Sequence, residues 1–145
     1  MFRGRFAHTI DAKGRTSIPS KFREVLAANY DERLIITNFD GCLWAYPVAE
    51  WQTIENKVAA LPQFKEEVKA LQRIFISAAT ECPVDKQGRI IIPPTLRDYA
   101  GLKKNIILVG MTKRIEIWSK EGWEEIFEKA QKKISTDGGL GDLGL

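Results

Sequence analysis

The chain has 145 residues, enough for one compact domain or two small ones that share a core, and its 44% hydrophobic and 28% charged residues are typical of a soluble globular protein. No apolar run approaches the roughly 20 residues of a membrane helix, and no hydrophobic leader follows Met1, so we expect a cytoplasmic protein without a membrane partner. Its net charge of +3 is too small to indicate a partner by itself.

Side chains that bind metals are too few for a structural zinc site. Cys42 and Cys82 lie far apart and outside any CxxC pair, and His8 is the only histidine. Structural zinc usually takes four such ligands. We therefore expect reduced, partly buried thiols, no metal and no cofactor.

The charge is distributed unevenly along the chain. Residues 1–30 contain six Lys or Arg against two acids, and residues 81–114 contain seven against three, so each block carries +4. The segments 31–80 and 115–145 sum to −2 and −3. Two basic blocks separated by acidic ones indicate localised contact with a polyanion.

The chain contains an internal repeat. A shift of 74 positions places residues 11–23 over residues 85–97, and six of the thirteen positions are identical. The shift also matches further apolar residues. These pairs are Leu34 with Leu108 and Trp44 with Trp118, followed after a two-residue deletion by Trp51 with Trp123 and Ile54 with Ile126. Agreement over this length indicates duplication.

Each repeat predicts the same elements in the same order. A strand leads into an Asp-x-x-Gly turn, a second strand leaves it, and a short helix follows the next proline, with Thr95 as N-cap and Gly101 as stop in the second copy. Two β-rich runs and a longer amphipathic helix then complete the repeat. The predicted strands are 15–18, 34–37 and 41–46 in the first repeat, and 89–92, 105–109 and 114–118 in the second.

Apolar residues at helical spacing mark the faces of the longer helices. They are Trp51, Ile54, Val58 and Leu61 in the first repeat, Phe64, Val68, Leu71 and Phe75 between the repeats, and Trp123, Ile126, Phe127, Ala130 and Ile134 in the second. Because these helices flank a small β unit, we expect part of their apolar surface to contact a partner subunit. We place the first repeat at 5–51, a helical connection at 52–78, the second repeat at 79–123, a C-terminal helix at 124–134 and a disordered, glycine-rich tail at 135–145.

The Asp-x-x-Gly motif has a clear structural explanation. The carboxylates of Asp11 and Asp85 can accept backbone N–H groups of the turn, while Gly14 and Gly88 supply the positive φ of a type I turn with a glycine bulge. A single such motif would indicate a tight bend between strands and nothing more. Here it occurs twice at equivalent positions.

Arginine follows the turn glycine in both copies, although the turn does not need it. Arg15 and Arg89 either form an ion pair with the loop aspartate or contact nucleic acid through the guanidinium fork, and both roles are compatible. Further cations lie nearby in the sequence: Arg3, Arg5 and Lys13 in the first repeat and Lys86 in the second. We therefore predict a DNA-binding site made of these six cations, with the two aspartates and two glycines shaping its loops.

Together these motifs resemble the MraZ family of bacterial regulators, within the AbrB/SpoVT swapped-hairpin superfamily. The resemblance runs from Met1 to about Lys132 and rests on the start Met1-Phe2-Arg3-Gly4, the paired loops, the prolines after them and the strand 115–118.

The resemblance implies an α+β fold in which two swapped-hairpin β repeats of one chain form a single pseudo-twofold β-barrel, flanked by amphipathic helices. It implies a ring-shaped homo-oligomer at the nucleoid that binds short direct repeats of double-stranded DNA in a promoter and represses its own division and cell-wall gene cluster. By position, Arg15 and Arg89 would face the DNA, with Asp11 and Asp85 as their loop partners.

Other classes of function compete with this interpretation. An enzyme is disfavoured by the single histidine and by the lack of a Walker A loop, a GxGxxG motif and a clustered acid pair, so we expect neither catalysis nor a small-molecule substrate. An antitoxin-like module that binds DNA and protein would share the swapped-hairpin fold, but such chains usually carry one hairpin and a long disordered tail. A purely structural ring protein would show no salt-sensitive DNA affinity.

Overall fold

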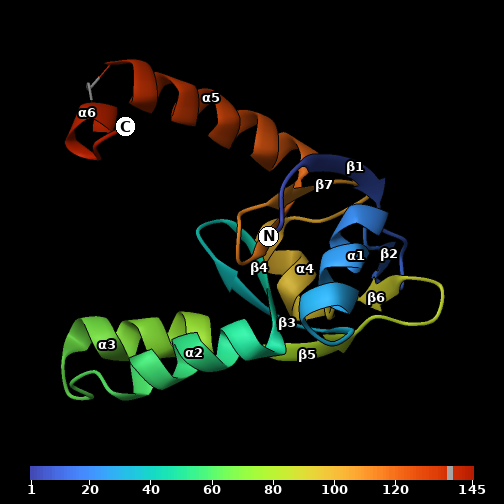
Figure 1. Ribbon diagram of the computed structural model, residues 1–145, viewed down its shortest axis with the longest axis horizontal. Coiled ribbons are helices and arrows are strands. Elements are labelled where there is room, and N and C mark those ends of the chain that lie inside the picture. The colour runs from blue at the N-terminus through green and yellow to red at the C-terminus, as the bar shows by residue number, and fades with distance from the viewer. Residues whose placement is uncertain (137–138) are drawn as a thin grey trace.

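The computed structural model describes residues 1–136 and 139–145 (Figure 1). Its strands are β1 (Arg5–Thr9), β2 (Arg15–Ser17), β3 (Arg33–Phe39), β4 (Cys42–Pro47), β5 (Thr80–Pro83), β6 (Arg89–Ile91), β7 (Asn105–Gly110) and β8 (Ile115–Ser119). Its helices are α1 (Ser20–Asn29), α2 (Val48–Ala59), α3 (Glu66–Leu71), the π-helical turn η1 (Gln72–Ile76), α4 (Pro94–Ala100), α5 (Lys120–Thr136) and α6 (Gly139–Asp142).

These elements make a mixed α and β fold with antiparallel strands, as the sequence predicts. One sheet has the order β1-β7-β8-β4-β3-β5, and β2 and β6 form a separate two-stranded ribbon. A single buried cluster joins both sheets with α1 and α4, and its members come from both repeats. It includes Ile18, Phe22, Leu26, Leu34, Ile36, Ile90, Ile92, Leu96, Ile106, Leu108 and Ile117. The two repeats therefore share one core instead of folding as separate units.

The strand that leaves each loop pairs with its counterpart in the other repeat. In the ribbon, Thr16 lies opposite Ile90, and Arg15 and Ser17 lie opposite Ile91 and Arg89. This register is symmetric under the 74-residue shift, so a pseudo-twofold relation passes through the centre of the ribbon.

The strand registers correct the position of the two-residue deletion between the repeats. Ile36 pairs with Ala45 in the first repeat and Leu108 pairs with Ile117 in the second, which is a shift of 72 residues. The deletion therefore precedes β7, where α4 is shorter than α1. The expected matches of Leu34 with Leu108 and of Trp44 with Trp118 are wrong. Trp44 corresponds to Glu116, its partner across β4 and β8.

The short helices begin at proline instead of at a side-chain cap. Pro19 and Pro93 occupy the N-cap positions of α1 and α4, and neither helix has a side-chain capping bond. The expected N-cap Thr95 is therefore wrong, because α4 already begins at Pro94, a residue that tolerates the first turn well. Gly101 ends α4 in the left-handed conformation with φ of +64°, as expected.

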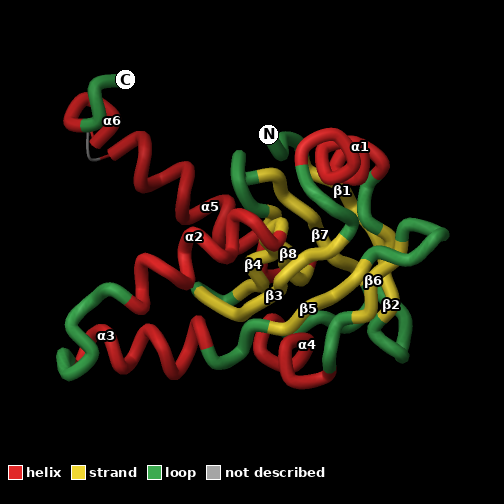
Figure 2. The backbone as a smooth tube through the Cα atoms, turned by 60° about the horizontal axis from the view of Figure 1, so that its bottom comes forward, coloured by secondary structure: helices red, strands yellow, loops and turns green. Residues whose placement is uncertain are grey.

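The longer helices form two arms on the side of the molecule opposite to the ribbon, as both views show (Figures 1 and 2). Tyr46, Trp51 and Phe75 make a buried aromatic cluster that fixes the α2–η1 arm to the main sheet. Trp118 of β8 is packed against Trp123, which anchors α5. These contacts confirm the inner halves of the predicted apolar faces.

The outer ends of both arms leave apolar side chains exposed. Phe64 precedes α3 and is 94% exposed, whereas the sequence places it in the helical face. Leu61 and Ile134 are 42% and 54% exposed. The arms therefore carry apolar surface that this chain does not cover.

The C-terminal tail differs in part from its predicted boundaries. Ser135 and Thr136 belong to α5, and α6 forms one further turn, while 137 and 138 of the expected disordered segment lie outside the described residues. The disorder itself stays a prediction. In the described part of the chain, no helix has the length and apolar character needed to cross a membrane.

Candidate nucleic-acid interface

Both Asp-x-x-Gly segments fold as the sequence predicts. In the first loop (11–14), the Gly14 amide donates to the Asp11 carbonyl at 3.0 Å, and the Asp11 amide donates to the Arg15 carbonyl at 3.1 Å. The second loop (85–88) repeats both bonds at 2.9 and 2.8 Å. Gly14 and Gly88 have φ of +87° and +77°, a conformation that disfavours side chains with a Cβ.

The aspartate of each loop accepts several hydrogen bonds from its own turn. Asp11 Oδ1 accepts the amides of Lys13 and Arg15 at 3.0 and 2.9 Å, and Asp85 Oδ1 accepts those of Gln87 and Arg89, both at 2.9 Å. These bonds stabilise the ionised carboxylate. The backbone amide of Arg15 is the largest cause that lowers the pKa of Asp11, and the amide of Arg89 has the same effect on Asp85.

The second oxygen of each carboxylate holds the arginine side chain. Arg15 Nε lies 2.7 Å from Asp11 Oδ2, and Arg89 Nε lies 3.4 Å from Asp85 Oδ2. The four side chains are 39–49% exposed, so solvent screens each pair and it adds little to stability. The ion pairs orient the arginine side chains. Within the described residues neither guanidinium uses its Nη atoms in a hydrogen bond, so these atoms can form a fork onto a ligand.

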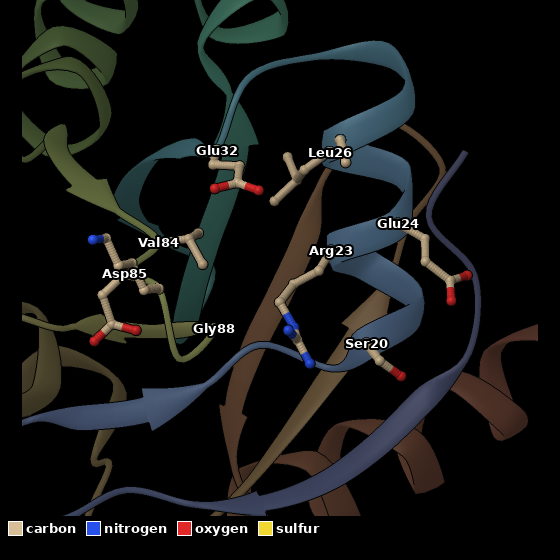
Figure 3. A pocket seen from close by; sticks show the side chains of 10 residues that line it. Ser20, Arg23, Glu24, Leu26, Glu32, Val84, Asp85 and Gly88 are labelled. Atoms are coloured by element: carbon tan, nitrogen blue, oxygen red, sulfur yellow. The ribbon is translucent and has the colours of Figure 1, made fainter.

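An arginine from the opposite repeat supports each loop. Arg97 of α4 donates from Nε to the Ile92 carbonyl at 2.9 Å and from Nη1 to the Ala12 carbonyl of the first loop at 3.2 Å. Arg23 of α1 donates to the Ile18 carbonyl at 3.1 Å and lies against Gly88 (Figure 3). Sequence reasoning gave neither arginine a role, although both are identical residues of the repeat.

Backbone bonds between the repeats complete this support. The Ile18 amide donates to the Gly88 carbonyl, and the Ile92 amide donates to the Gly14 carbonyl, both at 2.8 Å. Each loop is thus fixed to the strand end of the other repeat, and the two loops are held in one rigid relation.

The outer face of the ribbon carries both loop arginines. Thr16 and Ile90 point inward and are buried, so alternation along the strands leaves Arg15, Ser17, Arg89 and Ile91 on the outer face. Ile91 is 61% exposed on this face, between the two loop arginines. Sequence reasoning missed it, because in 89–92 it stands within an apolar run.

Two further cations lie beside this face. A groove of about 630 Å³ is lined by Asp11, Arg15 and Arg89 together with Lys103 and Lys104, which precede β7. Both lysines are exposed. The pairing of β1 with β7 brings them to the first loop, because the Ile10 amide donates to the Lys104 carbonyl at 2.9 Å. Because both lysines lie far from the first loop in the sequence, sequence reasoning did not assign them to the site.

The other predicted cations divide between two places. Lys13 and Lys86 are exposed in the loops themselves. Arg3 and Arg5 lie at the far end of β1, and Arg5 stacks on α5 with its guanidinium carbon 4.9 Å from the ring centre of Phe127. The structure therefore brings Lys13 and Lys86 to the arginines and does not bring Arg3 and Arg5 there. In the described residues, no three His, Cys, Asp or Glu side chains are grouped to hold a metal ion.

The comparison with protein families decides the relationship of the chain. The family model described as "MraZ protein, putative antitoxin-like" matches twice, at residues 1–74 and 75–138, which agrees with the duplication. The chain belongs to the MraZ family. The boundary between the two matches lies in η1, just before β5 opens the second repeat.

Curated relatives of the family match almost end to end. Proteins named transcriptional regulator MraZ are 43% identical in Natranaerobius thermophilus, over 94% of this chain and 93% of that protein, and 50% identical in Limosilactobacillus reuteri, over 86% of each. One from a Thermoanaerobacter strain is 48% identical over 86% of this chain and 85% of its own length. A solution structure of a Pyrococcus horikoshii protein matches with a TM-score of 0.35 and 19% identity over 81% of this chain and 88% of that one.

Proposed function

We propose that this chain is a transcriptional regulator that binds double-stranded promoter DNA through its two Asp-x-x-Gly-Arg loops. One observation carries the proposal: the β2–β6 ribbon places Arg15 and Arg89 diagonally on one exposed face, each aimed by a loop aspartate. The names of the curated relatives support the regulatory role.

A two-stranded ribbon is a form that can read DNA sequence directly. The major groove of B-DNA admits a two-stranded β-ribbon, and an arginine fork pairs with the O6 and N7 atoms of guanine. In such a complex Arg15 and Arg89 read guanines, and the exposed Ile91 contacts a thymine methyl group. Lys13 and Lys86 contact phosphates on either side.

The pairing between β2 and β6 supports a swapped-hairpin barrel, in which each repeat completes the other and one chain acts as a dimer of hairpins. The uncovered apolar ends of the arms support assembly of chains into a ring, and a ring that binds promoter DNA would lie at the nucleoid. A ring repeats the loop surface, so its subunits can bind several direct repeats about one helical turn apart at the same time. Avidity then strengthens binding at the promoter, and the bound ring represses the gene cluster.

Removal of one loop arginine tests the proposal. Arg15→Ala should weaken binding to the DNA immediately upstream of the coding gene by about 1–3 kcal/mol and leave circular dichroism unchanged, because the ion pair contributes little to folding. Arg73→Ala on η1 is the matched control, since it also removes one exposed positive charge. A folded Arg15→Ala protein with wild-type affinity would show that the loops do not bind DNA.

The assembly has its own test. Ile134 is exposed on α5, so Ile134→Glu should leave each chain folded while it weakens contacts between chains. Light scattering should report a mass several times 16.4 kDa for the wild type and a smaller one for the variant. Affinity for one DNA repeat should then change little and affinity for an array should collapse. Equal loss on both would contradict the avidity mechanism.

The family description also mentions antitoxins, and this supports a second candidate, a module that binds DNA and a protein toxin. That function needs a segment free to wrap a partner. The two candidates differ in the effect of removing residues 135–145, which should abolish toxin capture but leave promoter binding intact.

A further inference from the structure

The pseudo-twofold symmetry of the proposed DNA site is broken by charge. Two hydrogen bonds identify equivalent positions: the Ile10 amide donates to the Lys104 carbonyl and the Val84 amide donates to the Glu32 carbonyl, both at 2.9 Å. Each bond holds the residue that directly precedes a loop aspartate. Lys104 and Glu32 therefore occupy the same place beside the first and the second loop.

The neighbouring position repeats the difference. Under the 72-residue shift of β3 and β7, Lys103 corresponds to Asp31. The first loop is thus flanked by two lysines, for +2. The second is flanked by two acids, but Asp31 is paired with Arg33 at 2.6 Å, which leaves that flank at −1. All four side chains are exposed, and Figure 3 shows Glu32 facing the pocket beside the second loop.

The ribbon between the loops is also asymmetric. At equivalent outward positions the first repeat has Ser17 and the second has Ile91. The two arginines and the turns that hold them are alike, whereas the outward strand position and the charged flank differ.

From this asymmetry we infer that each subunit binds double-stranded DNA in a single orientation, with the phosphates of one flank held by Lys103 and Lys104 beside the first loop. The opposite flank, beside Asp31 and Glu32, repels phosphate, so the subunit makes no phosphate contact there. The inference rests on the proposed function and adds a polarity to it. A symmetric site would favour inverted repeats, whereas a site with polarity matches direct repeats.

The first test measures how much Lys103 and Lys104 contribute to the salt dependence of DNA binding. Each phosphate contact changes the slope of log K against log salt by about 0.9, so Lys103→Gln/Lys104→Gln should lower it by about 1.8, or roughly 30-fold in affinity near 0.15 M salt. The probe is the double-stranded fragment immediately upstream of the coding gene. Lys57→Gln/Lys113→Gln removes the same charge from α2 and from the turn at the other end of β7, and should leave the slope unchanged.

The second test measures orientation directly. Ala12→Cys and Gln87→Cys place a single reactive thiol at the tip of the first or the second loop, where both side chains are exposed and neutral. The native cysteines are buried, so an iron–EDTA reagent labels only the new thiol. Each conjugate should cut the probe at one end of every bound repeat, and the two conjugates should cut at opposite ends.

A charge exchange links the two tests. Asp31→Asn/Glu32→Lys makes the second flank basic, and in this background each conjugate should cut at both ends of a repeat. Cutting at both ends by the wild-type conjugates would overturn the inference, as would one-ended cutting that persists after the exchange or a wild-type salt slope in Lys103→Gln/Lys104→Gln. Should the exchange variant not fold, the wild-type conjugates and the salt slope still decide.

Failure of the inference is distinct from failure of the proposed function. If the wild type binds the probe and Arg15→Ala weakens binding while the lysine variant binds normally, only the polarity is wrong. If the wild type shows no salt-sensitive binding to the probe, the DNA-binding function itself is wrong.

Discussion

Replacement of Gly14 by alanine should destabilise the protein more than the same replacement at Gly88 or Gly101. All three glycines have positive φ, so each alanine carries a backbone strain of about 1–2 kcal/mol. The positions differ in what a new Cβ would meet. At Gly101 nothing lies within 4 Å, at Gly88 the Cβ would lie 2.8 Å from the Arg23 guanidinium, and at Gly14 it would overlap the Ile92 carbonyl oxygen.

These surroundings set the expected magnitudes. Gly101→Ala should lose only the free energy of the backbone strain, about 1–2 kcal/mol. Gly88→Ala also displaces Arg23, a flexible side chain, and loses its bond to Ile18, so we expect about 2–3 kcal/mol. Gly14→Ala cannot be accommodated by movement of a side chain, because the backbone of the other repeat must shift. This strains two hydrogen bonds between the repeats and the Arg97–Ile92 bond within the second repeat, so we expect a loss of about 3–5 kcal/mol.

Thermal unfolding followed by circular dichroism measures this series. At about 2–4 °C per kcal/mol for a chain of this size, the midpoint should fall by about 4 °C for Gly101→Ala and by about 12 °C for Gly14→Ala. Equal losses at all three positions would mean that φ strain alone acts, and the mutual support of the repeats would be refuted. A larger loss at Gly88 than at Gly14 would refute the assigned packing.

Three other predictions follow from the described contacts. Asp11 and Asp85 have pKa values below the usual 3.8, so the stability that they add is complete above pH 3.8 and is lost as the pH falls through their folded-state pKa values. The NMR shifts of the two carboxyl groups should titrate below pH 3.8, and a midpoint above that pH would contradict the hydrogen bonds of the turns. Burial raises the pKa of the Cys82 thiol to about 11 and raises that of Cys42 further, so iodoacetamide at pH 8 should label neither until the protein unfolds. Glu116 is buried and accepts from Arg114 at 2.8 Å and Trp118 at 3.0 Å, so Glu116→Ala should cost about 3 kcal/mol in chemical denaturation, and a loss under 1 kcal/mol would show that the pair is dispensable.

The sequence predicts the loops well because their geometry is local. Asp11 and Gly14 are three residues apart, and the turn that joins them follows from the chemistry of those two residues. The same holds for the end of α4 at Gly101. Most strands were also predictable, since aliphatic runs rich in isoleucine, such as Leu34–Ile36, have a clear pattern.

The sequence does not predict partners across the fold. Strand patterns tell which residues alternate but not which strand lies alongside, so the pairing of β2 with β6 and the proximity of Lys104 to Ile10 could not be foreseen. Matching by residue type also misled the repeat alignment. Trp44 and Trp118 look equivalent, yet the register shows that Trp44 stands opposite its true counterpart, Glu116.

The charge asymmetry between the flanks of the two loops can exist because both repeats lie in one chain. In a symmetric dimer of identical chains, any substitution appears on both sides of the twofold axis. Here the equivalent positions Trp44 and Glu116 have diverged into complementary roles: Arg114 stacks 3.7 Å from the centre of the Trp44 ring and also bonds to Glu116. A homodimer would place two tryptophans or two glutamates at this junction. The fused chain keeps the loop arginines alike, where the proposed DNA contact needs two of them, and lets the positions around them differ.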